Sequence, residues 1–425
     1  MKNAASTLGW VALGLLLLAS FVVDVENVSQ GGAIDLRNRI TGIRLLVHQI
    51  DPYHYKWQEP EPPEYCDPYN NPLLPVSKTT ATPALLLLHL PLAVLPYRIA
   101  QFLWFLLQWA LLLGTAWLWL RRCPNSFSRW LTALFFIGFT YTSAWRLHAE
   151  RGQSYVLLLF LFACWLVVTL DAKTSHRFLA GLLAGFLITL RPPFALLLPF
   201  LVRHRRDQLA GAIVGLLLGF GLPLLWDADC WSDYFSAMQS HSAFYLTDNN
   251  PHYEQTYPPM IEGIPTDNIL AYYVPIPYAD FSIHALLKYL GWEIHLVELM
   301  PPHLLIAIPF ILWLWFSRKQ STEALLPGVV AWLFLVDLFL PAYRNSYNDV
   351  LILNFVALGF LASTRISRAT WLCLLALPLG WSIYALSPNQ PWLINLPSFL
   401  FAFSTVLFLF LFNNRAITHK MDVPC

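Results

Sequence analysis

Residues 8–23 read LGWVALGLLLLASFVV, and residues 31–53 read GGAIDLRNRITGIRLLVHQIDPY. The first stretch holds no charged residue and resembles a helix that crosses the hydrocarbon of a membrane, for which about 20 residues are needed. The second stretch is polar, and it places the carboxylate Asp35 among several arginines directly beyond that helix. The two stretches together predict a membrane protein with a group of charged side chains just outside its first span.

The composition of the whole chain agrees with this class. Of its 425 residues, 57% are hydrophobic and 12% are charged, with 26 basic and 25 acidic side chains. Such a near-neutral balance excludes a nucleic-acid-binding protein, which needs a basic face. The aromatic, weakly charged composition also excludes a disordered chain. Because the apolar runs are continuous rather than alternating, we expect an all-α polytopic membrane protein rather than a β-barrel.

Apolar runs and their breakers predict a bundle of about 12 transmembrane helices in a single integral-membrane domain, residues 1–425. Two large loops, residues 24–82 and 227–301, interrupt it, and the Pro-broken run at residues 83–95 suits an interfacial or re-entrant helix. The boundaries around residues 83–96, 178–202 and 302–316 stay open because these runs are short for a span. The predicted spans are residues 8–23, 97–120, 130–145, 153–170, 178–190, 194–202, 209–226, 303–316, 324–340, 350–361, 371–386 and 392–412.

The distribution of basic residues predicts the orientation of the chain. The short connections on the side of the N-terminus are rich in arginine and lysine, as at Arg121-Arg122 and at residues 203–206. Under the positive-inside rule this side is cytoplasmic, so both large loops are extracytoplasmic and the protein is expected in the plasma (inner) membrane. Lys2 and the apolar run after it would also suit a signal peptide, but no small-residue cleavage site follows Ser20, which favours a retained span.

The six cysteines form no C-x-x-C pair, so neither a zinc site nor a thioredoxin-like site is indicated. Cys66 and Cys230 are the two that lie in the outer loops, where oxidation is permitted, and the sequence leaves open whether they are bridged. Asp227 and Asp229 have the spacing of a D-x-D pair that could bind a divalent metal. We expect no cofactor, and no metal that is essential.

Asp35 is the first candidate for chemistry. A carboxylate beside a membrane span can act as a general base. It can equally be a solvated acid paired with Arg37 or Arg39, since exposed ion pairs of this kind are common and weak. The residues alone leave both interpretations open.

Further short motifs accompany Asp35 along the chain: Asp51-Pro52-Tyr53, the prolines before the second span, Gly152-Gln153, and Arg191-Pro192-Pro193. In this layout, over most of residues 1–360, the chain resembles the C-type glycosyltransferase superfamily (GT-C). More narrowly it resembles glycosyltransferase family 87, the polyprenol-phosphate-mannose-dependent mannosyltransferases. It departs from the family at Arg191, where a lysine is usual. It also departs at residues 343–348, YRNSYN, where a tryptophan and a histidine are frequent.

The resemblance implies an inverting transfer of mannose or another hexose from a polyprenyl-phosphate donor to a lipid or glycan acceptor on the outer face. Asp35 would be the general base, and no general acid is required because the phosphate leaves as an anion. The transition state would resemble an oxocarbenium ion. The phosphate needs cationic partners, and the candidates for them are Arg191, Arg344 and His241.

Each candidate also has a plainer interpretation. Arg191 can snorkel at a membrane boundary, although charge within a membrane is usually functional. Arg344 can be a loop charge or a partner of Asp337 or Asp349, and His241 can be an exposed loop residue. Asp51 suits a turn and a cap. The residues predicted to bind substrate are Arg37, Arg44, Asp51, Tyr53 and Gln153.

Two rival functions stay open. A transporter or flippase of lipid-linked substrates would place its charges at mid-membrane inside broken helices. A non-catalytic assembly subunit would tolerate the replacement of Asp35. Most acidic residues of this chain fall in the two outer loops, which favours chemistry outside the membrane. The expected partners are the sugar donor, the acceptor and membrane lipids, with no nucleic acid; the acceptor and the oligomeric state cannot be read from the sequence.

Overall fold

The computed structural model describes residues 2–70, 74–171, 176–246, 260–261, 264–265, 302–317, 320–339 and 346–362. Within these ranges the regular structure is helical except for two paired strands, β1 (Met260–Ile261) and β2 (Ile264–Pro265). The predicted class, a helical membrane protein, is confirmed at this level.

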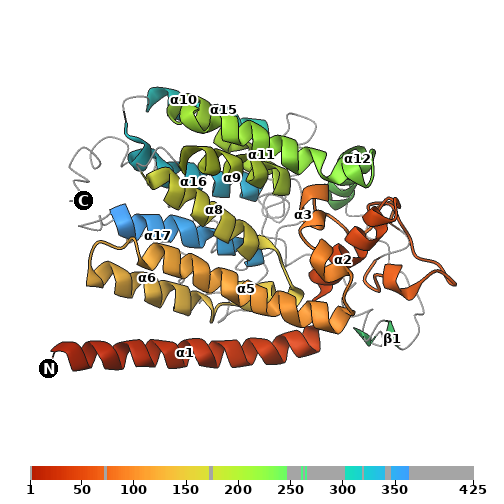
Figure 1. Cartoon of the computed structure of the whole chain (residues 1–425), viewed down its shortest axis with the longest axis horizontal. Coiled ribbons are helices and arrows are strands. Elements are labelled where there is room, and N and C mark those ends of the chain that lie inside the picture. The colour runs from red at the N-terminus through yellow and green to blue at the C-terminus, as the bar shows by residue number, and fades with distance from the viewer. Residues whose placement is uncertain are drawn as a thin grey trace.

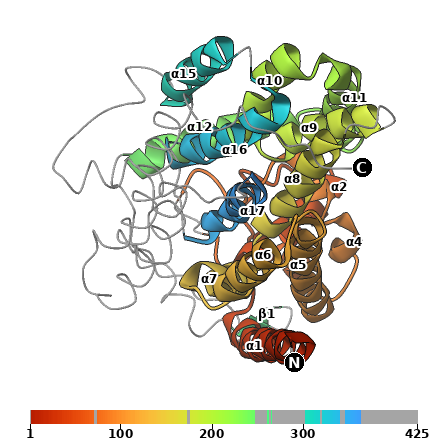
Figure 2. The same cartoon turned by 90° about the vertical axis from the view of Figure 1, so that its left-hand side faces the viewer.

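The long helices form a bundle whose members run along the longest axis of the molecule (Figure 1). The first of them, α1 (Lys2–Gly31), lies along one side, where it contacts α6 and α7 (Figures 1 and 2). The helices α2, α3 and α12 lie at the end of the bundle opposite the N-terminus. The remaining α-helices are α2 (Ile34–Val47), α3 (Pro83–Leu87), α4 (Leu90–Ala93), α5 (Tyr97–Leu120), α6 (Ser126–Phe139), α7 (Ser143–Arg151), α8 (Tyr155–Leu170), α9 (Arg177–Leu190), α10 (Leu197–His204), α11 (Leu209–Gly221), α12 (Cys230–Leu246), α15 (Pro302–Phe316), α16 (Thr322–Phe339) and α17 (Ile352–Ala362).

Five short 3₁₀ helices connect or extend these elements in the described residues. They are η1 (Pro63–Tyr65), η3 (Pro192–Leu196), η4 (Arg206–Gln208), η5 (Pro223–Leu225) and η8 (Ser346–Leu351).

Three of the described helical segments are long and apolar enough to cross a membrane: Thr7–Ser29, Tyr97–Leu120 and Arg206–Leu225. A fourth is obtained if Ala144–Arg151 and Tyr155–Leu170, which meet at 111°, form one broken span. The predicted count of about 12 is therefore not established, and the spans predicted at residues 371–386 and 392–412 lie outside the described residues. Shorter apolar helices of 10–17 residues occupy Ser126–Phe139, Arg177–Leu190, Ala307–Phe316, Ala324–Asp337 and Tyr347–Gly359.

The prediction that residues 31–53 form a loop is wrong, because most of this stretch is α2. Gly32 and Ala33 have φ angles of 71° and 52°, which end α1 and turn the chain into the new helix. Apolar residues such as Leu36 and Ile40 are fully buried. The arginines between them hid the apolar pattern of this helix in the sequence.

The span predicted at residues 130–145 is also wrong. The α6 helix ends at Phe139, and α7 begins at Ser143. The hydroxyl of Thr142 accepts a hydrogen bond from the Trp145 backbone N–H at 3.3 Å and caps the start of α7. Such a cap supplies a partner for one of the free N–H groups of a helix start, so the chain can begin a new helix here.

Glycines bring α9 and α11 into close contact. A Cβ atom at Gly185 would lie 2.1 Å from the Ala212 carbonyl oxygen, and one at Gly215 would lie 2.3 Å from the Leu182 carbonyl oxygen. Small residues of this kind let two membrane helices pack backbone to backbone. The contact fixes the end of α9, from which Arg191 follows.

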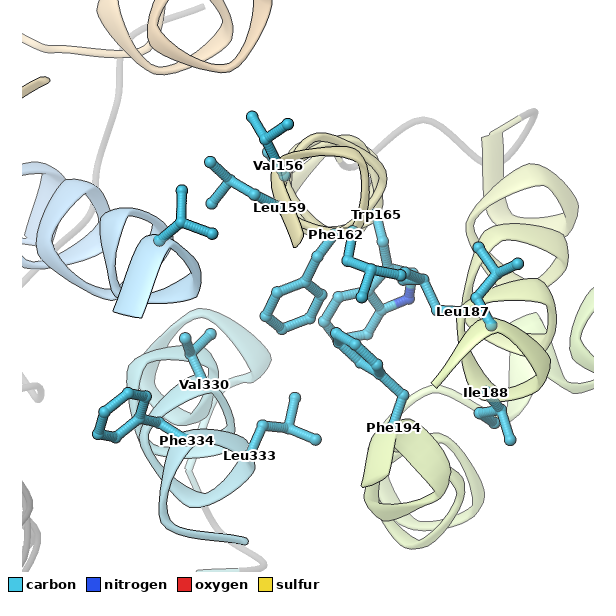
Figure 3. Packing of buried hydrophobic residues seen from close by; sticks show 14 of the residues in the cluster. Val156, Leu159, Phe162, Trp165, Leu187, Ile188, Phe194, Val330, Leu333 and Phe334 are labelled. Carbon is cyan, nitrogen blue, oxygen red and sulfur yellow. The ribbon is translucent and has the colours of Figure 1, made fainter. Parts of the chain in front are cut away.

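Aromatic and aliphatic side chains from α8, η3 and α16 fill the centre of the bundle (Figure 3). The rings of Phe162 and Phe194 pack edge to face with centroids 5.1 Å apart, and Trp165 stacks on Phe162 at 5.5 Å. Burial of large rings is worth about 1.5–3 kcal/mol for each side chain. This core holds α8 against η3, and so places Tyr155 and Arg191 at the same end of the bundle.

A buried ion pair ties α1 to α7. Asp24 of α1 is fully buried, and its carboxylate accepts hydrogen bonds from Arg146 and, at 2.7 Å, from the Trp145 indole N–H. The first span, predicted to end at residue 23, therefore continues past a carboxylate because α7 supplies its partners.

The thiols of Cys66, Cys123, Cys164 and Cys230 are free. A bridge between Cys66 and Cys230, left open by the sequence, is therefore not formed in the structure. Burial raises the pKa of both thiols to about 12, so both are protonated at neutral pH.

Candidate active site

Asp35 lies in the first turn of α2, where the positive end of the helix dipole favours a carboxylate. The C-terminus of α7 packs against this turn through Gly152. Gly152 has a φ of 67°, and a Cβ there would lie 2.7 Å from the Leu36 Cβ and 3.1 Å from the Ala33 Cβ. Only glycine suits a position that requires both the left-handed conformation and such close contact. The Gly152-Gln153 motif thus brings the chain after α7 onto Asp35.

The carboxylate of Asp35 is held by two residues that are distant in sequence. Its Oδ2 accepts hydrogen bonds from Arg151 Nε and Gln153 Nε2, both at 2.5 Å, and its Oδ1 accepts one from Arg151 Nη2 at 3.2 Å. Burial alone would raise the pKa of Asp35, but the charge and hydrogen bond of Arg151, with the charges of Arg39 and Lys78, outweigh it and lower the pKa. Asp35 is therefore ionised at neutral pH.

Arg39 fixes the orientation of Gln153 beside Asp35. Its Nη2 donates to Gln153 Oε1 at 2.8 Å, and its Nη1 donates to the Asp35 backbone oxygen at 2.7 Å. Because the amide oxygen of Gln153 is held by Arg39, its amide nitrogen faces the carboxylate of Asp35. The sequence left open an ion pair of Asp35 with Arg37 or Arg39. The structure pairs Asp35 with Arg151 instead, and Arg39 acts through Gln153 and the backbone.

A second carboxylate and a lysine lie close to Asp35. Burial raises the pKa of Asp67 and lowers that of Lys78, and both residues interact electrostatically with Asp35. Asp67 Oδ1 accepts the Tyr69 backbone N–H at 3.0 Å, whereas its buried Oδ2 has no hydrogen-bond partner among the described residues. Lys78 Nζ lies 5.5 Å from the centre of the Tyr69 ring.

Arg191 follows α9 and lies in a second polar group. Its guanidinium forms an ion pair with Asp337, donates to the Tyr155 hydroxyl at 2.8 Å, and lies 4.5 Å from the centre of the Tyr155 ring. Asn348 donates to the other oxygen of Asp337 at 3.3 Å. A cavity of about 20 Å³, lined by Arg191, Asp337 and apolar side chains, adjoins this pair. It has room for about one water molecule.

Two tyrosines whose rings are in tilted contact connect Arg191 with the Asp35 group. The rings of Tyr155 and Tyr347 lie 5.7 Å apart, and the Arg151 guanidinium lies 5.9 Å from the Tyr347 ring. Asp35, Gln153 and Arg191, predicted as base, substrate ligand and phosphate ligand, are therefore parts of one polar region. It is formed by α2, the end of α7, the start of α8, the junction of α9 with η3, α16 and η8.

A comparison with family models identifies the chain. The model of glycosyltransferase family 87 matches residues 80–341, which is more than half of the chain. The chain belongs to glycosyltransferase family 87. It is therefore a membrane glycosyltransferase, and the resemblance seen in its motifs is confirmed. No curated protein and no solved structure matches it.

The family match includes Gly152, Gln153 and Arg191 of the transferase but begins after Asp35. The family match therefore gives no support for a role of Asp35, and the only argument for one is the set of contacts that its side chain makes. Arg151, Lys78 and Asp67 were not predicted from the sequence as site residues. Arg151 directly precedes the Gly152-Gln153 motif, and that adjacency is the signal that could have identified it.

The other two predicted phosphate ligands are Arg344 and His241. Arg344 lies outside the described residues. His241 is on α12, where burial lowers its pKa to about 4. It is thus neutral at pH 7, and it would reach a phosphate only as a neutral hydrogen-bond donor.

The two arginines predicted to bind substrate tie α2 to segments that follow it in the chain. Arg37 is fully buried and donates to the Cys66 carbonyl oxygen from Nε at 3.2 Å and Nη2 at 2.8 Å. Arg44 donates to the carbonyl oxygens of Ala93 at 2.9 Å and Leu95 at 3.0 Å. Their predicted contact with substrate stays a prediction.

Asp51 and Tyr53 likewise have structural partners. Asp51 Oδ1 accepts the Tyr53 backbone N–H at 2.7 Å, which is the turn expected as the alternative to a binding role. The fully buried Tyr53 donates its hydroxyl to the Ala81 carbonyl oxygen at 2.9 Å.

In the D-x-D pair, Asp227 Oδ1 accepts the Asp229 backbone N–H at 3.0 Å. In the part of the chain that the structure describes, no three histidine, cysteine or acidic side chains converge as a metal site would require.

Proposed function

We propose that the protein transfers a sugar, mannose or another hexose, from a polyprenyl phosphate to a lipid or glycan acceptor with inversion, and that Asp35 is the general base. The observation that carries this proposal is the carboxylate of Asp35, kept ionised by Arg151 and oriented by Gln153 at one end of the helical bundle. An oriented, ionised carboxylate can take the proton of a hydroxyl group.

The reaction then balances with a single base. The oxygen of the acceptor hydroxyl attacks the anomeric carbon from the face opposite the phosphate, and its proton passes to Asp35. The bond from the anomeric carbon to the phosphate oxygen breaks, and its electron pair stays on the polyprenyl phosphate. Since this leaving group is an anion, it needs cations rather than a proton donor. A resident cofactor has no part in this scheme.

Arg191 is the first predicted cation for the phosphate, with Arg344 and His241 as further candidates. The ion pair of Arg191 with Asp337 means that a phosphate at this position would have to share the guanidinium with a carboxylate. The five donors of a guanidinium permit such sharing. Gln153 remains the candidate for contact with substrate hydroxyls, since it borders the carboxylate of Asp35.

The positive-inside rule supports an extracytoplasmic site in a plasma membrane. The basic turn after α5 lies at the same end of the bundle as the N-terminus, and α2 lies at the other end (Figure 1). If the basic end is cytoplasmic, Asp35 faces the exterior, where polyprenyl-phosphate sugars serve as donors because nucleotide sugars are cytoplasmic.

A flippase or transporter of lipid-linked substrates is the second candidate. It is favoured by the Arg191–Asp337 ion pair at the proline break between α9 and η3, because carriers place charged pairs at broken helices. A carrier would move its substrate unchanged, and the carboxylate of Asp35 would not be needed for that movement.

The test is transfer by purified protein in liposomes that contain radiolabelled polyprenyl-phosphate mannose and a lipid extract. We expect label to appear in a new glycolipid or glycan. The Asp35→Asn variant should bind donor but lose about 10²- to 10⁴-fold in turnover, the usual value of positioned proton transfer. The matched control is Glu64→Gln, which makes the same change at an exposed carboxylate of the same segment. Undiminished turnover by Asp35→Asn would remove Asp35 as the base, and movement of intact donor without transfer would favour the carrier.

A further inference from the structure

The Pro-broken run at residues 83–95 contains α3 and α4, and His89 lies directly before α4 with its side chain fully buried. Its Nδ1 lies 2.8 Å from the Leu85 carbonyl oxygen, which can only accept a hydrogen bond, so Nδ1 carries the proton. Burial lowers the pKa of His89 to about 3, so the ring is neutral at pH 7. The other ring nitrogen, Nε2, is therefore a hydrogen-bond acceptor.

The hydroxyl group of Ser154 donates to this Nε2 at 3.3 Å. Ser154 directly follows Gln153 and directly precedes α8, a position where a serine side chain usually accepts an N–H group of its own helix. This serine does not cap α8. The Val156 N–H donates instead to His148 Nε2 at 3.1 Å. Because His148 caps the helix, the hydroxyl of Ser154 is left to bind His89.

The ring of Trp104, on α5, holds the other side of the same turn. Its indole N–H donates to the Gly152 carbonyl oxygen at 3.0 Å, and its ring centre lies 4.6 Å from that of His89. Both residues are buried, His89 completely and Trp104 with 2% of its surface exposed. The residues before and after Gln153 are therefore each bound by one of two rings that pack against each other.

The segment that carries His89 is itself fixed to the helical bundle. At the start of α3, the Thr82 hydroxyl accepts the Leu85 backbone N–H at 3.2 Å. The same hydroxyl donates to the Leu190 carbonyl oxygen at 3.3 Å, at the end of α9 and directly before Arg191. The segment at residues 82–93 thus joins the part of the bundle that carries Arg191 to the turn at Gln153.

We propose that His89 and Trp104 are positioning residues of the transferase, which hold the turn at Gln153 so that its amide keeps the carboxylate of Asp35 in place for proton transfer. The inference rests on the proposed function, since it assumes that Asp35 is the base. The Gln153 amide donates to Asp35 Oδ2 at 2.5 Å, so a shift of this turn would move the amide away from the carboxylate. A misplacement of about 1 Å can lower a reaction rate by about 100-fold.

Steady-state transfer by purified full-length variants in liposomes, with radiolabelled polyprenyl-phosphate mannose as donor, tests the inference. His89→Asn keeps a donor for the Leu85 carbonyl oxygen but removes the acceptor for Ser154, whereas His89→Gln keeps an acceptor near the position of Nε2. We expect His89→Asn to lower kcat by about 3- to 10-fold, as the loss of one hydrogen bond implies, with an unchanged KM for the donor. His89→Gln should recover most of this loss.

Trp104→Phe keeps a ring against His89 and removes only the indole N–H, so the same fall in kcat is expected. Its matched control is Trp231→Phe, which removes an indole N–H that donates to the Phe220 carbonyl oxygen at 2.9 Å, outside this turn. The control should keep the wild-type kcat. Thermal unfolding identifies variants that fail to fold. If His89→Asn is one of them, Ser154→Ala removes the donor of the same hydrogen bond and carries the test.

The deciding measurement repeats these substitutions in an Asp35→Asn background. If His89 and Trp104 act through the orientation of the base, they should change the residual rate there by less than about 2-fold, because residues that act as one unit are not additive. A loss by the same factor in both backgrounds would overturn the inference, and so would a wild-type kcat in either His89→Asn or Trp104→Phe. Undiminished turnover by Asp35→Asn, or no transfer by the wild type, would instead remove the proposed function and the inference with it.

Discussion

At the scale of single residues, Asp35 is a carboxylate on which burial and an ion pair act in opposite directions. Burial disfavours the charged form, and Arg151 favours it. The balance keeps the carboxylate ionised but would also make it a weaker base, because a carboxylate with a lowered pKa attracts a proton less strongly. The residue at position 151 should therefore set the pH range in which Asp35 can function as the proposed base.

The pH dependence of turnover should reveal this balance. In the wild type the pKa of Asp35 is lowered, so the proposed base stays ionised as the pH falls to about 4, the usual carboxyl value. In Arg151→Gln, burial persists while the opposing charge is lost, so the pKa rises and turnover should begin to fall at a higher pH. The measurement is kcat at saturating donor between about pH 4 and pH 8.

Arg98→Gln, at an exposed position near the start of α5, is the control for the pH profile and should give the wild-type curve. An Arg151→Gln profile that coincides with the wild type would mean that Asp35 does not carry the titrating proton.

The same residues show how much of the site the sequence could reveal. Asp35 and Gln153 were both predicted as site residues, and the structure joins their side chains at 2.5 Å. The pairing of Asp35 with Arg151 could not be predicted, because 116 residues separate them and no local period relates them. Lys78 and Asp67 were missed because a polar, proline-rich segment carries no repeating pattern that would show which of its charges turn inward.

At the scale of elements, the predictions of helix boundaries succeeded where strong helix-breaking or charged residues flank an apolar run. The α5 helix occupies Tyr97–Leu120, as predicted, because Pro96 precedes it and Arg121-Arg122 follow it. They failed at α2, whose buried arginines bind backbone oxygens and so do not look like core residues in the sequence. The break between α6 and α7 was missed because threonine is only a weak helix breaker. The sequence does not show that the hydroxyl groups of Thr140 and Thr142 donate hydrogen bonds to backbone carbonyl oxygens here.

The contact between α9 and α11 gives a prediction at this scale. In Gly185→Ala, the added methyl group would meet the Ala212 carbonyl oxygen at 2.1 Å, so the two helices must separate. Overpacking of this kind costs about 1–3 kcal/mol. We expect a lower midpoint of thermal unfolding in detergent and reduced transfer, because Arg191 follows directly from α9.

Gly221→Ala is the matched control, since a Cβ there meets nothing within 4 Å. It should leave the unfolding midpoint unchanged or raise it slightly, because alanine favours a helix more than glycine does by about 0.8–1 kcal/mol. Equal unfolding midpoints for the two variants would show that the helices are not held at this separation.

At the scale of the whole molecule, the polar segments and the basic turns are separated by the length of the bundle (Figure 1). The surface of α1 between these ends is apolar, with Leu8 72% and Leu15 63% exposed, as a lipid-facing helix requires. A bilayer around this surface would place Asp35 near one face of the membrane and the turn after α5 near the other. The direction of the bundle across the membrane then decides which compartment supplies the donor.

Labelling of single cysteines tests that direction. In a background without the six native cysteines, Glu64→Cys and Ser236→Cys place exposed thiols on η1 and α12, and Ser126→Cys places one at the start of α6. Because the basic turns predict a cytoplasmic N-terminus, an impermeant maleimide should react with residues 64 and 236 in intact cells and with residue 126 only after the membrane is opened. The opposite pattern would put Asp35 in the cytoplasm. A nucleotide sugar would then be within reach of the site, and the case for a polyprenyl-phosphate donor would lose its topological support.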